Sequence, residues 1–385
     1  MAKQSFFVDE FQGLPLKRAL SYILKKREEK KAVVGVYCTY APIELIYAAD
    51  AIPAVLCAFA NGPITKAEEV LPANLCPLIK SSYGFIQLGT CPFFELTDAI
   101  VGETTCDGKK KMFELISEKR PMFVMDLPQN PKGRGALDHW KESIKEFKGF
   151  LEKTLKVTIT EEKVREAIKE NQEKNALIMK IFDYSSQSPS VVSWTELYDV
   201  ACMGMVCRGS DLKPKLLEIL SILENRVKNE EYTAAKDAPR VLVTGSPLGG
   251  DTFKVYKLIE EEGGVVVSMD SCTGRKSFVP TFDANEKDVY AALAKRYLEI
   301  PCACMSPNEG RFAELSTQIE KYKTQAVVDV VLQACHTYNI ESHSVEKFVS
   351  EKYKLPFLKV VTDYSQEDVG QLKTRLGALL EMARN

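Results

Sequence analysis

The sequence has almost no excess charge and no long hydrophobic run, and each absence excludes a class of protein. Its 51 Lys and Arg residues nearly balance its 53 Asp and Glu residues, for a net charge of −2, so the overall charge does not predict nucleic-acid binding. Residues 32–60 are rather apolar, but two prolines and two acidic residues interrupt them, whereas a membrane span needs about 20 mostly apolar residues. The first residues lead into no apolar segment of the kind found in secretory signals. We therefore expect a cytoplasmic protein that binds neither nucleic acid nor membrane.

Cysteine, by contrast, is abundant, with 11 residues in a chain of 385. Disulfide bonds are not expected in a chain without a secretory signal. Buried cysteines often serve as small hydrophobic residues, and we expect this of Cys202, Cys207 and Cys272. The cysteines of the N-terminal region are different in their placement. They show none of the close C-x-x-C pairs that are typical of zinc sites, and they lie at residues 38, 57, 76, 91 and 106.

The stretch 102–111 carries the clearest signal for chemistry. A short apolar run, 99–101, predicts a buried strand before it, and 109–119 has the pattern of an amphipathic helix after it. Cys106 therefore lies at a strand-to-helix turn, where free backbone N–H groups and the positive end of the helix dipole favour a thiolate. Because the thiolate is the form that binds metal, we predict that Cys106 belongs to an iron–sulfur site.

Two further cysteines follow predicted strands. Residues 32–37 and 52–56 read as β-branched, apolar strands with a helix between them, which predicts a parallel βαβ unit. Cys38 and Cys57 stand at the carboxyl ends of these strands, the edge where open α/β sheets bind ligands. We therefore place both residues near the predicted site.

Cys76 and Cys91 are each followed by proline. Proline fixes φ and removes an N–H donor, so each Cys-Pro is a stiff position, and Cys-Pro also occurs in ferredoxin-type cluster motifs. The wide spacing of these residues requires a folded sheet to bring them together.

The second half of the chain predicts another parallel sheet, with Cys335 at the carboxyl end of the strong strand 326–332. The glycine-rich loop 246–251 fits neither common nucleotide-binding motif, and we interpret it as a tight turn rather than a phosphate site. The predicted fold class is α/β, with two Rossmann-like (flavodoxin-like) domains and a cleft between their facing carboxyl ends. The expected boundaries are 1–138 for the first domain, 139–236 for a helical connecting segment and 237–385 for the second domain.

Several motifs together resemble the 2-hydroxyacyl-CoA dehydratase family, in its D-component or benzoyl-CoA reductase-like group. Within that group, the chain is most similar to the double-cubane cluster proteins. The resemblance covers nearly the whole chain and is most specific at the cysteine motifs. These are residues 37–45 (YCTYAPIEL), 75–85 (LCPLIKSSYGF), 91–94 (CPFF), 102–111 (GETTCDGKKK), 333–338 (QACHTY) and 363–375.

The resemblance implies a cluster between two Rossmann-like domains, a homodimer, and an ATP-hydrolysing iron–sulfur activator protein that supplies low-potential electrons. It implies that Cys76, Cys106 and Cys335 bind one cubane. For a second cubane we select Cys38, Cys57 and Cys91, with Cys302 and Cys304 in reserve. The lysines at 109–111 either offset cluster charge or form a solvated helix face. Weak candidates for residues near the reacting centre are Glu44, Gln371 and Arg375.

The function expected from this resemblance is ATP-dependent reduction of small molecules at a double-cubane [8Fe–9S] cluster. The alternative is a 2-hydroxyacyl-CoA dehydratase subunit with a single [4Fe–4S] cluster. Two further alternatives are an electron carrier without a substrate of its own and a zinc protein. Metal analysis distinguishes the zinc protein from the iron–sulfur alternatives.

Overall fold

The computed structural model describes residues 5–8, 14–279, 281 and 286–384. In this part of the chain it contains two four-stranded parallel sheets. The strands of the first sheet lie in the order β2-β1-β3-β4, and the registers Val34↔Pro53, Val34↔Ala99 and Ile100↔Met122 pair them in parallel. The bounds of these strands are β1 (Val33–Val36), β2 (Ile52–Val55), β3 (Ala99–Glu103) and β4 (Met122–Met125).

The second sheet repeats this order, as β6-β5-β7-β8. Its central strands are entirely buried and rich in β-branched residues, the pattern expected for parallel strands that are covered on both faces. The predicted fold class, α/β with two Rossmann-like domains, is therefore confirmed. The strands are β5 (Arg240–Gly245), β6 (Val265–Asp270), β7 (Ala326–Leu332) and β8 (Phe357–Thr362).

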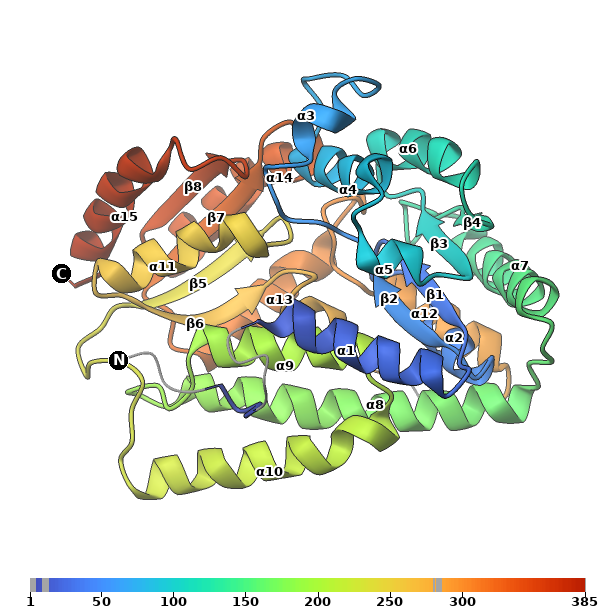
Figure 1. Cartoon of the computed structure of the whole chain (residues 1–385). Helices are drawn as coiled ribbons and strands as arrows, with labels where there is room; N and C mark the ends of the chain where they lie inside the picture. The colour runs from blue at the N-terminus through green and yellow to red at the C-terminus, as the bar shows by residue number, and fades with distance from the viewer. Residues whose placement is uncertain (1–4, 9–13, 280, 282–285, 385) are drawn as a thin grey trace.

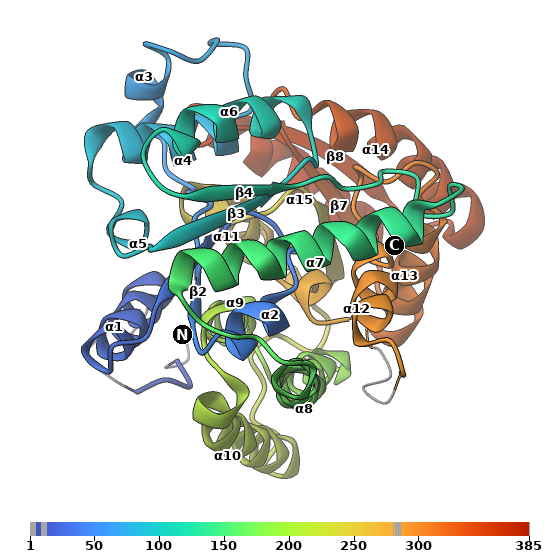
Figure 2. The ribbon, with the colours of Figure 1, turned by 90° about the vertical axis from the view of Figure 1, so that its right-hand side faces the viewer.

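Helices cover both faces of the first sheet. Figure 2 shows the long helix α7 crossing one face, with α4 and α6 on the far side of β3 and β4. The apolar side of α7 buries Trp140, Ile144 and Phe147, as expected for a helix packed along one stripe. The helices of this half are α2 (Ile43–Ala48), α3 (Ile64–Ala67), α4 (Pro77–Leu88), α5 (Pro92–Glu95), α6 (Asp107–Ser117) and α7 (Ala136–Leu155).

A layer of long helices lies beneath both sheets and joins them (Figure 1). One hydrophobic cluster contains Ile52 of β2, Leu197 of α9 and Val243 of β5, so the two halves share a core through this layer. The helices are α1 (Pro15–Glu28), α8 (Glu161–Asp183), α9 (Trp194–Val206) and α10 (Gly209–Lys228). The predicted domain boundaries at 138 and 236 stay predictions.

Four helices pack on the second sheet: α11 (Lys254–Glu261), α13 (Glu309–Lys321), α14 (His336–Phe348) and α15 (Val369–Arg384). The helix α12 (Val289–Leu298) packs instead against α7 of the first half. Among the described residues, no helix combines the length and the apolar character that crossing a bilayer requires.

Candidate functional site

The carboxyl ends of strands from both sheets line one cavity of about 350 Å³, which we call the sulfur cavity. Residues that follow β1, β3 and β4 line it from the first sheet, and residues that follow β5, β6 and β7 line it from the second. This is the edge where parallel α/β sheets bind ligands. The sulfur cavity is lined by Cys38, Cys76, Cys106, Cys272, Cys302, Cys304 and Cys335.

Three of these cysteines occupy the N-cap position of a helix. Cys76 precedes α4, Cys106 precedes α6 and Cys335 precedes α14. The first N–H groups of each helix face the sulfur and favour its thiolate, although no capping hydrogen bond of standard geometry forms. The predicted place of Cys106 at a helix start is therefore found in the structure. The proline after Cys76 also marks a helix start, because Pro77 is the first residue of α4 and proline suits the first turn of a helix.

The sulfur cavity brings these N-cap cysteines together from both halves. Donation of its thiol proton to Cys335 raises the pKa of Cys76 well above its ordinary value, and burial adds to this rise. The same interaction lowers the pKa of Cys335 to about 6. Burial raises the pKa of Cys106, and the positive charge of Lys109 opposes that rise. The pairing with Cys76 thus favours the thiolate form of Cys335, the form that binds metal.

Two more thiol pairs lie at the inner side of the sulfur cavity. Cys38 donates to Cys272, which raises the pKa of Cys38 and lowers that of Cys272. Cys304 donates to Cys302, which raises the pKa of Cys304 and lowers that of Cys302. Cys302 and Cys304 come from the loop between α12 and α13, so this loop brings the two reserve candidates to the cavity.

Cys57 and Cys91 do not line the sulfur cavity. The Cys57 thiol donates to the Tyr37 carbonyl oxygen at 3.0 Å, and burial raises its pKa to about 11. The Cys91 sulfur accepts from the Phe94 N–H at 3.4 Å, as the N-cap of the short helix α5. Both residues instead line a neighbouring, mostly apolar cavity of about 280 Å³.

The three weak candidates also lie away from the sulfur cavity. Glu44 is fully buried and accepts hydrogen bonds at 2.7 Å from Asn171 and from Tyr297, so it links three helices. Gln371 and Arg375 are exposed on α15, and Arg375 donates to the Lys359 carbonyl oxygen at 2.8 Å.

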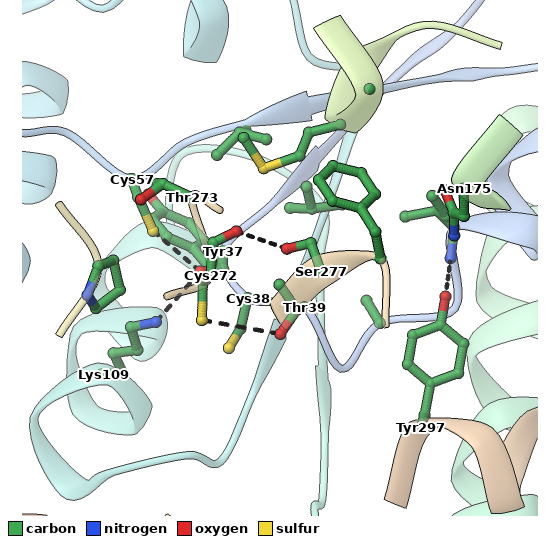
Figure 3. Close-up of a pocket in the computed structure, with 18 of the residues that line it drawn as sticks. Tyr37, Cys38, Thr39, Cys57, Lys109, Asn175, Cys272, Thr273, Ser277 and Tyr297 are labelled. Carbon is green, nitrogen blue, oxygen red and sulfur yellow. Dashed lines mark hydrogen bonds between the residues drawn. The ribbon is translucent and has the colours of Figure 1, made fainter. Parts of the chain in front are cut away.

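A third, smaller cavity of about 90 Å³ adjoins the sulfur cavity, and we call it the side cavity. Figure 3 shows the sulfurs of Cys38, Cys57 and Cys272 at one end of it with Lys109, and Tyr297 at the other end. Cys38, Cys272 and Lys109 line both cavities.

Lys109 supplies positive charge between the two cavities. Its ammonium donates to the Tyr37 carbonyl oxygen at 3.2 Å. Burial disfavours its charge, but the surrounding acidic groups Cys38, Cys57, Cys106 and Glu103 together outweigh burial and raise the pKa of Lys109 above its ordinary range. Lys110 and Lys111 point elsewhere, since they pair with Asp107 and Glu114 on the solvent side of α6.

The donor set suits a polynuclear cluster better than a single ion. In the described part of the chain, no three His, Cys, Asp or Glu side chains converge closely enough to hold one metal ion. In an iron–sulfur cluster each thiolate binds its own iron atom, so the ligands need not converge on one point. All eleven cysteines are free thiols, and those of the sulfur cavity line one shared space, six of them as neighbouring pairs.

Cys272 is the cavity residue that the sequence interpretation missed. That interpretation assigns it to simple burial, yet it follows β6 at the carboxyl edge of the second sheet. Cys38 and Cys335 are selected because they follow strands whose carboxyl ends bind ligands. Cys272 also follows such a strand, and its place in the sequence could have identified it.

The glycine-rich loop 246–251 has a structural role that its sequence does not reveal. It packs against the other half of the molecule, where the Asp251 N–H donates to the Phe59 carbonyl oxygen at 2.9 Å. In return, the Asp251 carboxylate accepts from the Asn61 N–H at 2.8 Å. A Cβ on Gly250 would lie 2.3 Å from the Phe59 oxygen, so only glycine permits this approach.

Comparison with known proteins gives concordant results. Residues 38–383 match the family model described as 2-hydroxyglutaryl-CoA dehydratase, D-component. The chain is 41% identical over 363 residues to a putative dehydratase subunit, YjiM, of Escherichia coli K12, covering 94% of each chain. It is 20% identical to the beta subunit of (R)-2-hydroxyglutaryl-CoA dehydratase of Acidaminococcus fermentans, over 98% of this chain and 99% of the relative. It is 22% identical to a benzoyl-CoA reductase subunit of Thauera aromatica, over 64% and 63% of the two chains.

Proposed function

This chain belongs to the 2-hydroxyglutaryl-CoA dehydratase D-component family, and we propose that it reduces small molecules at a double-cubane [8Fe–9S] cluster. Electrons would come from a separate ATP-hydrolysing activator protein, as the resemblance implies. The observation that carries the proposal is the sulfur cavity, where seven cysteines from both halves surround one space. A single cubane bound by three cysteines would leave four of them without a role.

We propose two sets of ligands. The first is the N-cap set, Cys76, Cys106 and Cys335, which agrees with the resemblance. For the second set the cavity favours Cys38, Cys272 and Cys302, with Cys304 as the thiol that donates to Cys302. Cys57 and Cys91, which the sequence interpretation selects, have protein partners outside this cavity.

When bound, such a cluster supplies electrons at low potential, and the chain's own residues supply position and charge. The helix N-termini and Lys109 place positive charge around the sulfurs, which stabilises a negatively charged group. The side cavity adjoins Cys38 and Cys272 and has apolar walls that include Val36, Val55 and Phe278. Its small volume of about 90 Å³ supports a small substrate rather than a CoA thioester.

The second candidate function is that of a 2-hydroxyacyl-CoA dehydratase subunit with one [4Fe–4S] cluster, and the names of the relatives favour it. Iron and acid-labile sulfide analysis of anaerobically purified protein separates the two. About eight irons per chain support the double cubane, and about four support the dehydratase. Zinc instead of iron would contradict both.

Cysteine-to-serine variants test the ligand sets. We expect Cys272→Ser and Cys335→Ser to lose about half of the iron or more, because each removes one cluster thiolate. Cys57→Ser and Cys91→Ser are matched controls from neighbouring loops and should keep the full iron content. Iron loss from the controls, with full retention in Cys272→Ser, would restore the set selected from the sequence.

The remaining test concerns turnover and assembly. With the activator, ATP and a strong reductant, the loaded protein should reduce small unsaturated molecules, whereas an electron carrier would show no such turnover. We propose a homodimer, which size-exclusion chromatography with light scattering checks directly.

A further inference from the structure

A buried tyrosine lines the sulfur cavity beside Cys302. Tyr338, in the first turn of α14, is 5% exposed, and its hydroxyl lies 3.7 Å from the sulfur of Cys302. The phenol has one hydrogen that it can donate. The neighbours of the Tyr338 hydroxyl determine the direction in which that hydrogen points.

Lys276 fixes this direction. Its ammonium lies 3.2 Å from the Tyr338 hydroxyl oxygen, and an ammonium can only donate. The oxygen therefore accepts from Lys276, and its own hydrogen is free for another acceptor. Among the described residues, the remaining hydrogen-bond partner of this hydroxyl is the Cys302 sulfur.

The ring of Tyr338 is also held in place by two cations. The Lys276 ammonium lies 5.5 Å from the ring centroid and the Arg311 guanidinium 5.4 Å, both within the range of cation–π attraction. Asp270 lies 3.0 Å from Arg311 and 3.9 Å from Lys276, and Glu341 pairs with Arg311 at 2.6 Å, so two carboxylates face the two cations. The hydroxyl is thus preorganised before any group enters the cavity.

A second tyrosine provides a natural contrast. The hydroxyl of Tyr40 lies 3.6 Å from the sulfur of Cys304, almost the same separation. Its hydrogen, however, is donated to the Ile300 carbonyl oxygen at 3.0 Å. Tyr40 can therefore accept from a thiol but offers no hydrogen to a thiolate or to a metal-bound sulfur.

We propose that Tyr338 is a positioning residue that donates a hydrogen bond to the Cys302 sulfur, and that this bond raises the reduction potential of the bound cluster. This inference rests on the proposed function, with Cys302 as a ligand. Hydrogen bonds to ligand sulfur are one of the protein's means of tuning cluster potential. They stabilise the reduced, more negative state more than the oxidised state. Lys276 acts through Tyr338 by directing the hydroxyl.

The test is an anaerobic redox titration followed by EPR spectroscopy, on wild type, Tyr338→Phe and the matched control Tyr40→Phe. We expect Tyr338→Phe to lower the midpoint potential, with a change of the order of tenfold in the ratio of reduced to oxidised cluster at fixed potential, about 59 mV for one electron. Tyr40→Phe should shift that ratio by less than about twofold. Lys276→Met should shift it in the same direction as Tyr338→Phe.

Each result of the titration either supports or contradicts the role of Tyr338. An unchanged potential in Tyr338→Phe, or equal shifts in both phenylalanine variants, overturns the inference. A folded Tyr338→Phe protein that no longer retains iron would assign the hydroxyl to cluster assembly and overturn it as well. If wild type itself holds no iron, the proposed function fails instead, so the two failures are distinguishable.

Discussion

Lys174 shows at the residue scale how a buried charge is tolerated outside the sulfur cavity. It is 1% exposed, and its ammonium donates to the Tyr47 hydroxyl at 3.1 Å and to the carbonyl oxygens of Gly204 at 2.8 Å and Cys207 at 3.0 Å. These carbonyls end α9, so Lys174 satisfies acceptors that the helix itself cannot. Burial nevertheless lowers the pKa of Lys174 to about 8.

This shift predicts a specific pH dependence of stability. Because the folded pKa lies below the unfolded value, the unfolded chain binds more protons between about pH 8 and pH 10.5, and stability contributed by Lys174 rises with pH there. We expect the unfolding free energy of wild type to increase by about 2 kcal/mol, relative to that of Lys174→Met, between pH 7 and pH 9.5. Urea denaturation at the two pH values measures it, with Lys180→Met on the exposed side of α8 as control. A difference that does not change with pH would contradict the prediction.

Individual residues were predicted best where one local rule decides their place. Cys106 and Cys335 follow short buried strands, and the structure puts both at helix starts in the cavity. Cys57 follows the same rule, yet its thiol turns toward the Tyr37 carbonyl oxygen. Which way a strand-end side chain points depends on neighbours from distant parts of the chain, which spacing does not encode.

At the scale of elements, α4 shows how tight packing places a ligand helix. Gly84 of α4 lies against the start of α3, where a Cβ would come 2.0 Å from the Pro63 carbonyl oxygen. A backbone oxygen cannot move aside as a side-chain tip can, so α3 and α4 can touch only at a glycine. The N-terminus of the same α4 carries Cys76.

We therefore expect Gly84→Ala to destabilise the protein by about 1–3 kcal/mol or more, through overpacking at the α3–α4 contact. Gly149→Ala is the matched control, since Gly149 lies in the exposed middle of α7 with nothing within 4 Å of an added Cβ. That substitution should stabilise by roughly 0.5–1 kcal/mol, because alanine is the better helix former. Thermal unfolding of both variants measures the contrast, and equal stability would disprove it.

The elements themselves were largely predictable. The strand expected at 326–332 has the same bounds in the structure, because a run of buried β-branched residues strongly favours a strand. The helix that begins at Pro77 was interpreted only as a stiff Cys-Pro position. Proline suits the first turn of a helix as well as a turn, and the residue alone does not decide between them.

At the scale of the whole molecule, the two halves meet at the loop 246–251. Gly250 has φ +48°, and Phe59 of the other half lies directly against it. The sequence interpretation expected a tight turn here, and only the folded chain reveals a contact between halves. Such contacts join segments far apart in sequence, and the local sequence of one segment does not identify the segment that it contacts.

Gly250→Ala should therefore destabilise the protein more than an ordinary glycine substitution. Gly89→Ala is the matched control, since Gly89 also has positive φ, at +62°, but nothing within 4 Å of an added Cβ. We expect the control to lose about 1–2 kcal/mol from backbone strain. Gly250→Ala should lose at least about 2 kcal/mol more, from the clash with Phe59. Chemical denaturation gives both values, and equal losses would show that the contact does not hold the halves together.

The origin of the cavity cysteines in both halves has a consequence for biosynthesis. During translation, residues 38, 76 and 106 leave the ribosome long before residue 335, so a nascent chain carries only part of the cavity's sulfur. The cavity gains its full set of cysteines only once the second half has been made and has folded against the first. Folding of the later half therefore completes a site that the earlier half begins.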